Sequence, residues 1–195
     1  RIVHGPVCTR IESVKSWGNS LFKVYTYIYR SMPRIDYAID AQWLETGSDS
    51  TDSPMLRTVF PIEQPNSTFY NDVAFNVIER PHDGLLHGQP TPEWLKSKES
   101  PVTSERSEGQ EVPAQKWVDV NDGQTGFALL NRSKYGHCYN DGELRLTLLR
   151  SAGYPDVYPN LGKFRIEYSI MPHQGNWTNG VMLAGLDYNL PVLAA

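Results

Sequence analysis

The 195-residue sequence has few cysteines and no long hydrophobic run. Its two cysteines, Cys8 and Cys138, are too few for a disulfide framework and lack the spacing of a metal-binding pair. We therefore expect two buried thiols. No apolar stretch approaches the roughly 20 residues that span a bilayer. The chain begins with neither a methionine nor the layout of a signal peptide, so we expect a fragment of a longer protein.

An excess of one charge is also missing. The 18 basic and 22 acidic residues give a net charge of -4, and they are spread along the chain rather than gathered in a basic stripe. Nucleic acids and anionic membrane surfaces are therefore not the expected partners. We expect an uncharged partner.

Self-contained catalytic motifs are absent as well. The sequence has no GxSxG nucleophile motif and no phosphate-binding glycine loop. Its five histidines show no recognised ligand pairing, since even His82 and His87 lie five apart in a loop-like stretch, and we predict no metal site. Carboxylate pairs such as Asp36 and Asp40 fit a solvated strand face better than a catalytic pair, because spacing along a strand does not fix a separation across a cleft.

What the sequence does contain is period-2 alternation, which indicates half-buried strands. The clearest examples are FRIEYSIM at 164–171 and IDYAIDAQW at 35–43, in which every second residue is apolar. LFKVYTYIY at 21–29 is a third strand, rich in β-branched and aromatic residues. Weaker strand candidates are CTRIESVK, MLRTVFPI, DVAFNVIE, QKWVDV and TGFALLN. No helical period recurs.

The fold class that follows is all-β. Strands with one apolar face must bury it against a second sheet, so we predict an antiparallel β-sandwich that occupies residues 1–195 as a single domain. The proline-rich, polar segment 80–115 has no steady period and is predicted to be a long loop. Eight aromatic residues could stack on sugar rings, although at strand spacing most aromatics are core: Trp17, Tyr25, Tyr27, Tyr29, Trp43, Trp94, Trp117 and Trp177.

Arg150 is the most informative single residue. Period-2 phasing places it on the same face as Leu144, Leu146 and Leu148, at the end of a strand whose turn begins at Ser151. A buried guanidinium without a partner costs several kcal/mol. Arg150 must therefore form an internal ion pair, with Asp119 or Asp156 for example, or lie at the rim of a cavity where a ligand meets it.

Six motifs occur in order along almost the whole chain, namely GPV, MPRIDYAIDAQWLE, LRTVFPI, IERP, VPAQKWVDVNDGQTGFALLNRSKYGHCYNDGELRLTLLRSAGYPDVY and EYSIMPHQGNW. The block from 112 to 173 is the most specific. Together they resemble the C-terminal β-domain of the class II α-mannosidases of glycoside hydrolase family 38. After YPD the chain departs from the family pattern, with PNLGKF at 159–164 in place of an acidic-then-basic turn and Gly-Glu-His.

The resemblance implies a retaining α-mannosidase that uses zinc and an aspartate nucleophile to remove terminal α-linked mannose. Those catalytic groups and the zinc belong to an N-terminal barrel outside this chain, on which the β-domain packs. The β-domain is implied to be a supersandwich of the galactose mutarotase-like type, here incomplete at both ends. Arg150 matches the arginine that reaches into the substrate cleft, and Asp156 in the adjacent YPD turn is a second substrate-binding candidate.

Partners and location follow from the same resemblance. We expect a mannose-containing oligosaccharide and the enzyme's own barrel as partners, with no nucleic acid and no membrane. Exposed strand edges of an incomplete sandwich could pair in a homo-oligomer. The pattern is closer to the microbial and cytosolic branch of the family, which implies the cytoplasm. Two alternatives stay open, namely an independent carbohydrate-binding module and a purely structural buttress.

Overall fold

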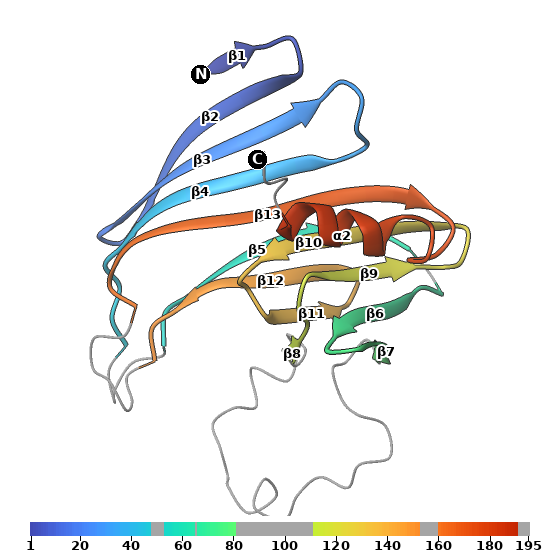
Figure 1. Ribbon diagram of the computed structural model, residues 1–195. Helices are drawn as coiled ribbons and strands as arrows, with labels where there is room; N and C mark the ends of the chain where they lie inside the picture. The colour runs from blue at the N-terminus through green and yellow to red at the C-terminus, as the bar shows by residue number, and fades with distance from the viewer. Residues whose placement is uncertain (48–52, 65, 81–110, 153–159, 191–195) are drawn as a thin grey trace, which may run out of the picture.

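A computed structural model shows a sandwich of two antiparallel sheets (Figure 1). It describes residues 1–47, 53–64, 66–80, 111–152 and 160–190. Among these residues one sheet has nine strands, in the order β1-β2-β3-β4-β13-β10-β9-β6-β7, and the other has four, in the order β5-β12-β11-β8. The predicted all-β sandwich is therefore confirmed.

The strands have the following bounds. Those of the larger sheet are β1 Ile2–His4, β2 Cys8–Trp17, β3 Ser20–Tyr29, β4 Ile35–Trp43, β13 Gly162–Gln174, β10 Thr125–Arg132, β9 Trp117–Asn121, β6 Thr68–Val73 and β7 Asn76–Arg80. Those of the smaller sheet are β5 Met55–Pro61, β12 Glu143–Arg150, β11 Gly136–Asn140 and β8 Val112–Pro113.

Strand β13 is the long central strand that alternation predicted. It pairs antiparallel with β4 on one side and with β10 on the other. Ile166, Tyr168 and Ile170 are buried and Phe164 is half-buried, as the period-2 pattern requires. The polar residues between them point to the outer face, where Ser169 is nevertheless buried and its hydroxyl donates to Asp36 Oδ1 at 2.7 Å.

The main core lies between the two sheets. Phe60 of β5 contacts Tyr37, Phe127 and Tyr168 of the larger sheet, with ring centroids about 6 Å apart. Leu144 and Leu146 of β12 are fully buried in the same cluster. Strands β1, β2 and β3 lie at one side of the larger sheet (Figure 1), and Phe22 of β3 is still buried in the core cluster.

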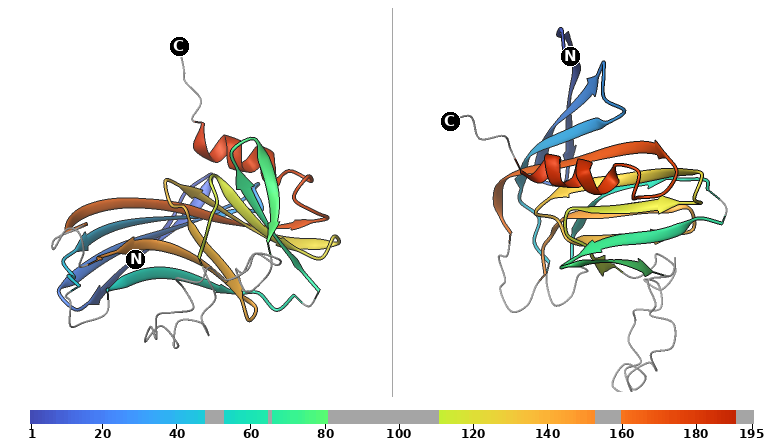
Figure 2. Two further views of the ribbon diagram at one scale, coloured as in Figure 1. Left: turned by 90° about the horizontal axis from the view of Figure 1, so that it is seen from below. Right: turned by 45° about the vertical axis from the view of Figure 1, so that its right-hand side comes forward.

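One helix, α2 Val181–Asn189, was not predicted. It packs on the outer face of β9 and β10 (Figure 2), where Gly185 lies so close to the Trp117 ring that a Cβ would come within 2.5 Å of it. A second buried cluster forms there around Trp117, Leu130 and Val181. A nine-residue helix is marginal in isolation, so packing rather than an amphipathic sequence pattern stabilises it.

Two further predictions need correction. DVAFNVIE was predicted as one strand, but β6 and β7 form a hairpin that turns at Ala74 and Phe75, and Val73 pairs with Asn76. The segment 80–115 was predicted as a loop, but Arg80 ends β7 and Val112–Pro113 form β8. Residues 81–110 lie outside the described part of the chain.

Candidate functional site

The end of β12 carries Arg150, and a β-bulge there changes which way the arginine points. Register with β5 shifts between Thr147 and Leu149, so Leu148 is the extra residue. Leu148 and Leu149 are consequently both buried, and Arg150 is exposed. The period-2 phasing that placed Arg150 in the core-facing row is therefore wrong.

Arg150 instead lies on the outer face of the smaller sheet. It pairs with Met55, whose sulfur contacts the Thr147 hydroxyl at 3.7 Å on that same face. Its guanidinium has no hydrogen-bond or ion-pair partner among the described residues. The side chain is thus free to meet a group outside this part of the chain.

The backbone around Arg150 is held firmly. Asn160 Nδ2 donates to the Arg150 carbonyl at 2.7 Å, and the Ser151 amide donates to the Pro54 carbonyl at 2.9 Å. The fully buried indole of Trp43 donates from Nε1 to Ser151 Oγ at 2.6 Å and so ties β4 of the larger sheet to β12. Rigid support of this kind is what a binding side chain requires.

An exposed aromatic ring lies at the same end of the sandwich. Trp17, the last residue of β2, stacks on Trp43 with ring centroids 5.8 Å apart and an interplanar angle of 18°. Trp17 is 53% exposed, whereas Trp43 is 0% exposed. Of the aromatics proposed from sequence as sugar platforms, Trp117 is buried in the core beneath α2, and Trp94 lies outside the described residues.

Asp119, one proposed ion-pair partner of Arg150, has other partners. It is fully buried on β9, where its carboxylate accepts from His173 Nε2 at 2.8 Å and from Asn121 Nδ2 at 2.6 Å. Burial lowers the pKa of His173, but the hydrogen bond to Asp119 and its negative charge outweigh that effect, so the pKa is raised. Asp156, the other candidate, lies outside the described residues.

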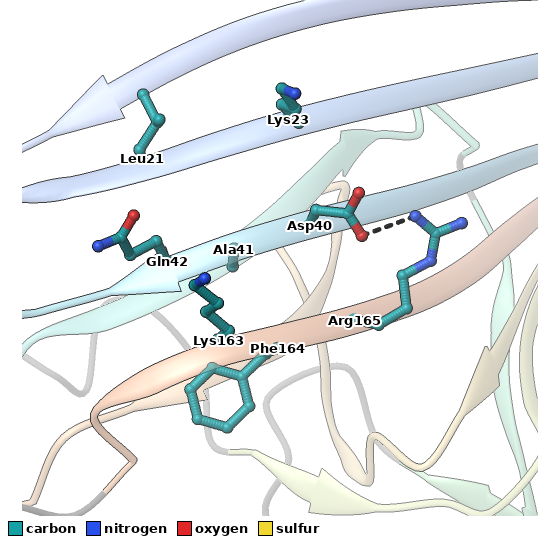
Figure 3. Close-up of a pocket in the computed structure, with 8 residues that line it drawn as sticks. All are labelled: Leu21, Lys23, Asp40, Ala41, Gln42, Lys163, Phe164 and Arg165. Atoms are coloured by element: carbon teal, nitrogen blue, oxygen red, sulfur yellow. Dashed lines mark hydrogen bonds and ion pairs between the residues drawn. The ribbon is translucent and has the colours of Figure 1, made fainter.

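A shallow trough of about 500 Å³ lies on the outer face of the larger sheet (Figure 3). Cross-strand pairing sets six outward side chains in two rows, Lys23-Asp40-Arg165 and Leu21-Gln42-Lys163. Arg165 Nη1 donates to Asp40 Oδ1 at 2.7 Å, which excludes Asp40 as a free catalytic carboxylate. The trough offers ammonium, amide and guanidinium donors that could hold the hydroxyl or acidic groups of a ligand.

The described residues contain no cluster of three or more histidine, cysteine or acidic side chains that could hold a metal ion. His137 of β11 is fully buried, and burial lowers its pKa to about 4. His82 and His87 fall outside the described part.

Cys138 is buried as expected, but Cys8 is only half-buried. No helix in the described residues is long and apolar enough to cross a membrane.

Residues 1–158 match the family model described as "Glycosyl hydrolases family 38 C-terminal domain". The chain belongs to this family. Two similar curated proteins are Alpha-mannosidase 2C1 of Mus musculus, 28% identical over 165 residues, and a yeast (Saccharomyces cerevisiae) Alpha-mannosidase, 33% identical over 79 residues. These alignments cover 83% and 40% of this chain, but only 14% and 7% of the relatives. The family 38 domain thus spans a small part of the relatives' length.

Solved structures agree on the fold. An alpha-mannosidase from Enterococcus faecalis V583 superposes with a TM-score of 0.65 at 15% identity, and another family 38 protein from Enterococcus faecalis with 0.62 at 14%. Each comparison covers 88% of this chain and 18% of the other. At such low identity the likeness concerns the sandwich alone. It supports the arrangement of sheets that positions Arg150.

Proposed function

We propose that this family 38 domain is the non-catalytic C-terminal β-domain of an α-mannosidase that hydrolyses terminal α-linked mannose. In this account the domain packs on the enzyme's catalytic barrel and contributes Arg150 to the substrate cleft. Hydrolysis is proposed to proceed with retention of configuration, and a zinc ion is proposed to be bound outside this chain. The proposed compartment is the cytoplasm.

The observation that carries this proposal is the combination of an exposed guanidinium and a rigid backbone at Arg150. A guanidinium offers five donors in a fixed fork, which suits sugar hydroxyls or a carboxylate that orients them. The bulge in β12 turns this fork away from the core, and the hydrogen bond from Trp43 to Ser151 anchors the next residue. Asp156 is proposed as a second contact from the neighbouring turn.

Activity assays of the full-length protein and of this chain test the proposal. The full-length protein should hydrolyse an aryl α-mannoside, and a zinc chelator should abolish that hydrolysis. The chain of residues 1–195 should show no turnover under the same conditions, because the nucleophile and the general acid are proposed to lie elsewhere. Turnover by the purified chain, with a mock purification as control, would refute the non-catalytic role.

A second candidate function is an independent carbohydrate-binding module. The exposed face of Trp17, stacked on the rigid Trp43, favours it, because such a ring can stack on a pyranose. Titration of the chain with α-linked mannotriose, followed by tryptophan fluorescence, separates the two functions. Binding by the chain that Trp17→Ala abolishes and Arg150→Ala leaves unchanged would favour the module. A purely structural buttress would bind no sugar at either residue.

Self-association is also proposed. The outermost strands of the two sheets, β1 and β7 in one and β5 and β8 in the other, have unpaired edges within the described residues. Such edges can pair with a second chain, so the full-length protein is proposed to form a homo-oligomer. Sedimentation equilibrium would measure its mass, and a strictly monomeric mass would contradict this part of the proposal.

A further inference from the structure

The turn between β6 and β7 has an unusual residue at its tip. Val73 pairs with Asn76, which leaves Ala74 and Phe75 as the two turn residues. Phe75 has a φ of 66° and is 107% exposed, so its ring projects fully into solvent. The hairpin forms one edge of the larger sheet, where β6 pairs with β9 (Figure 1).

Both properties of Phe75 are unfavourable in the chain alone. A positive φ suits glycine or asparagine, and for a bulky residue it is a genuine outlier. A fully exposed aromatic ring gains nothing from the hydrophobic effect. The two central turn residues, Ala74 and Phe75, are not usual turn residues, which is why alternation alone predicted one continuous strand here. A strained residue that surrounding structure does not explain points to function.

The base of the hairpin is rigid, so the ring is presented at a fixed place. Tyr70 of β6 and Val77 of β7 pack against the cluster that holds α2. Arg80 Nη2 donates to the Pro113 carbonyl at 3.4 Å, and Asn76 Oδ1 accepts from the Val77 amide at 2.9 Å. Interface hot spots are typically large side chains that fill a well-packed pocket on the partner.

We propose that Phe75 is an anchor that inserts into an apolar pocket on the part of the full-length enzyme outside this chain. The proposal rests on the function proposed above. This occupant is favoured because the chain corresponds to only 14% of the length of the mouse relative, so most of such a protein lies beyond it. A single projecting ring also fits a pocket better than a flat strand edge, which would pair through its backbone.

The proposal is tested by whether substitutions of Phe75 lower or raise the Tm of the full-length enzyme. Phe75→Asn relieves the positive-φ strain and deletes the ring, and Phe75→Gly does the same without a side chain. If the ring is buried in a pocket, both variants should lower the Tm by roughly 2–4 °C, because the lost burial exceeds the strain relieved. An unchanged or raised Tm overturns the proposal.

Ser133→Gly is the matched control. Ser133 is exposed and has a φ of 61° in the turn after β10, so this substitution should leave the Tm unchanged or raise it. A cysteine placed at position 75 should react with a thiol reagent far more slowly in the native enzyme than after unfolding. Fast native labelling overturns the proposal.

A second copy of the enzyme is the remaining occupant to exclude. If Phe75→Asn halves the mass measured by sedimentation, the anchor binds another copy and the proposal is wrong. An unchanged mass together with a lowered Tm supports it. Neither readout uses mannoside hydrolysis, so failure of the anchor is distinguishable from failure of the proposed activity.

Discussion

Trp43 Nε1 donates to Ser151 Oγ at 2.6 Å across the two sheets, between two residues 108 positions apart in the chain. Both residues have 0% exposure, so neither group can exchange this bond for one with water. The bond fixes the residue that follows Arg150. It is therefore the structural connection between the core and the proposed substrate contact.

Trp43→Phe should destabilise the chain by about 1–3 kcal/mol, because it leaves a buried serine hydroxyl without its donor. Ser151→Ala should cost less, and the double variant should cost less than the sum of the two. Urea unfolding of the four proteins measures this coupling. Strict additivity would show that the hydrogen bond does not contribute.

The pair His173 and Asp119 should make stability fall as pH rises. The folded-state pKa of His173 is raised above its ordinary value of 6.5, so its contribution is fully present below pH 6.5 and is lost as pH rises through the folded pKa. Thermal melts at pH 6 and pH 8 should show a larger drop in Tm for the parent chain than for His173→Gln. Equal drops would contradict the assignment.

His137 should have the opposite effect. Burial lowers its folded-state pKa from 6.5 to about 4, so the unfolded chain takes up a proton first and stability is lost as pH falls from 6.5 towards 4. The full loss is about 3 kcal/mol, from 1.36 kcal/mol per pKa unit. His137→Gln should reduce the slope of unfolding free energy against pH in that range. An unchanged slope would argue that another group dominates.

Gly126→Ala should be poorly tolerated, because a Cβ there would lie 2.4 Å from the ring atoms of His173 and 2.8 Å from the Cβ of Asn121. We expect a destabilisation of roughly 1–3 kcal/mol, as for other overpacked sites. In a His173→Ala background the penalty should shrink, since the ring is then absent. Gly123→Ala is not a suitable control because Gly123 has a φ of 86°, so Gly136→Ala serves instead.

The alternation of apolar and polar residues sufficed to predict the sandwich and most of its strands. Every second side chain of such a strand, Ile166 and Tyr168 for example, points into the core. It failed where geometry departs from the simple pattern. Just before Arg150, a β-bulge adds one residue to β12 relative to β5. The only sign of this bulge in the local sequence is the pair Leu148 and Leu149, two consecutive apolar residues that interrupt the alternation. Two apolar residues in succession before a charged one could have suggested that bulge.

Two other features depend on contacts that a sequence does not reveal. Helix α2 forms because Gly185 packs on Trp117, a contact between residues far apart in the chain. Neither central residue of the turn, Ala74 or Phe75, is a usual turn residue, so alternation predicted a strand there. The stacking of Trp17 on Trp43 was likewise hidden, although both had been named among the aromatics able to bind a sugar.

The most direct measurement of the central claim is the kinetics and Tm of Arg150→Ala in the full-length enzyme. Arg145→Ala is the matched control, because Arg145 lies on the same strand and is ion-paired with Glu143 at 2.7 Å. The account predicts that Arg150→Ala lowers kcat/KM by roughly 10- to 150-fold, equivalent to about 1.5–3 kcal/mol of lost binding, with an unchanged Tm. A Tm well below the parent's with normal kcat/KM in the folded fraction would show that Arg150 is structural and would contradict the account.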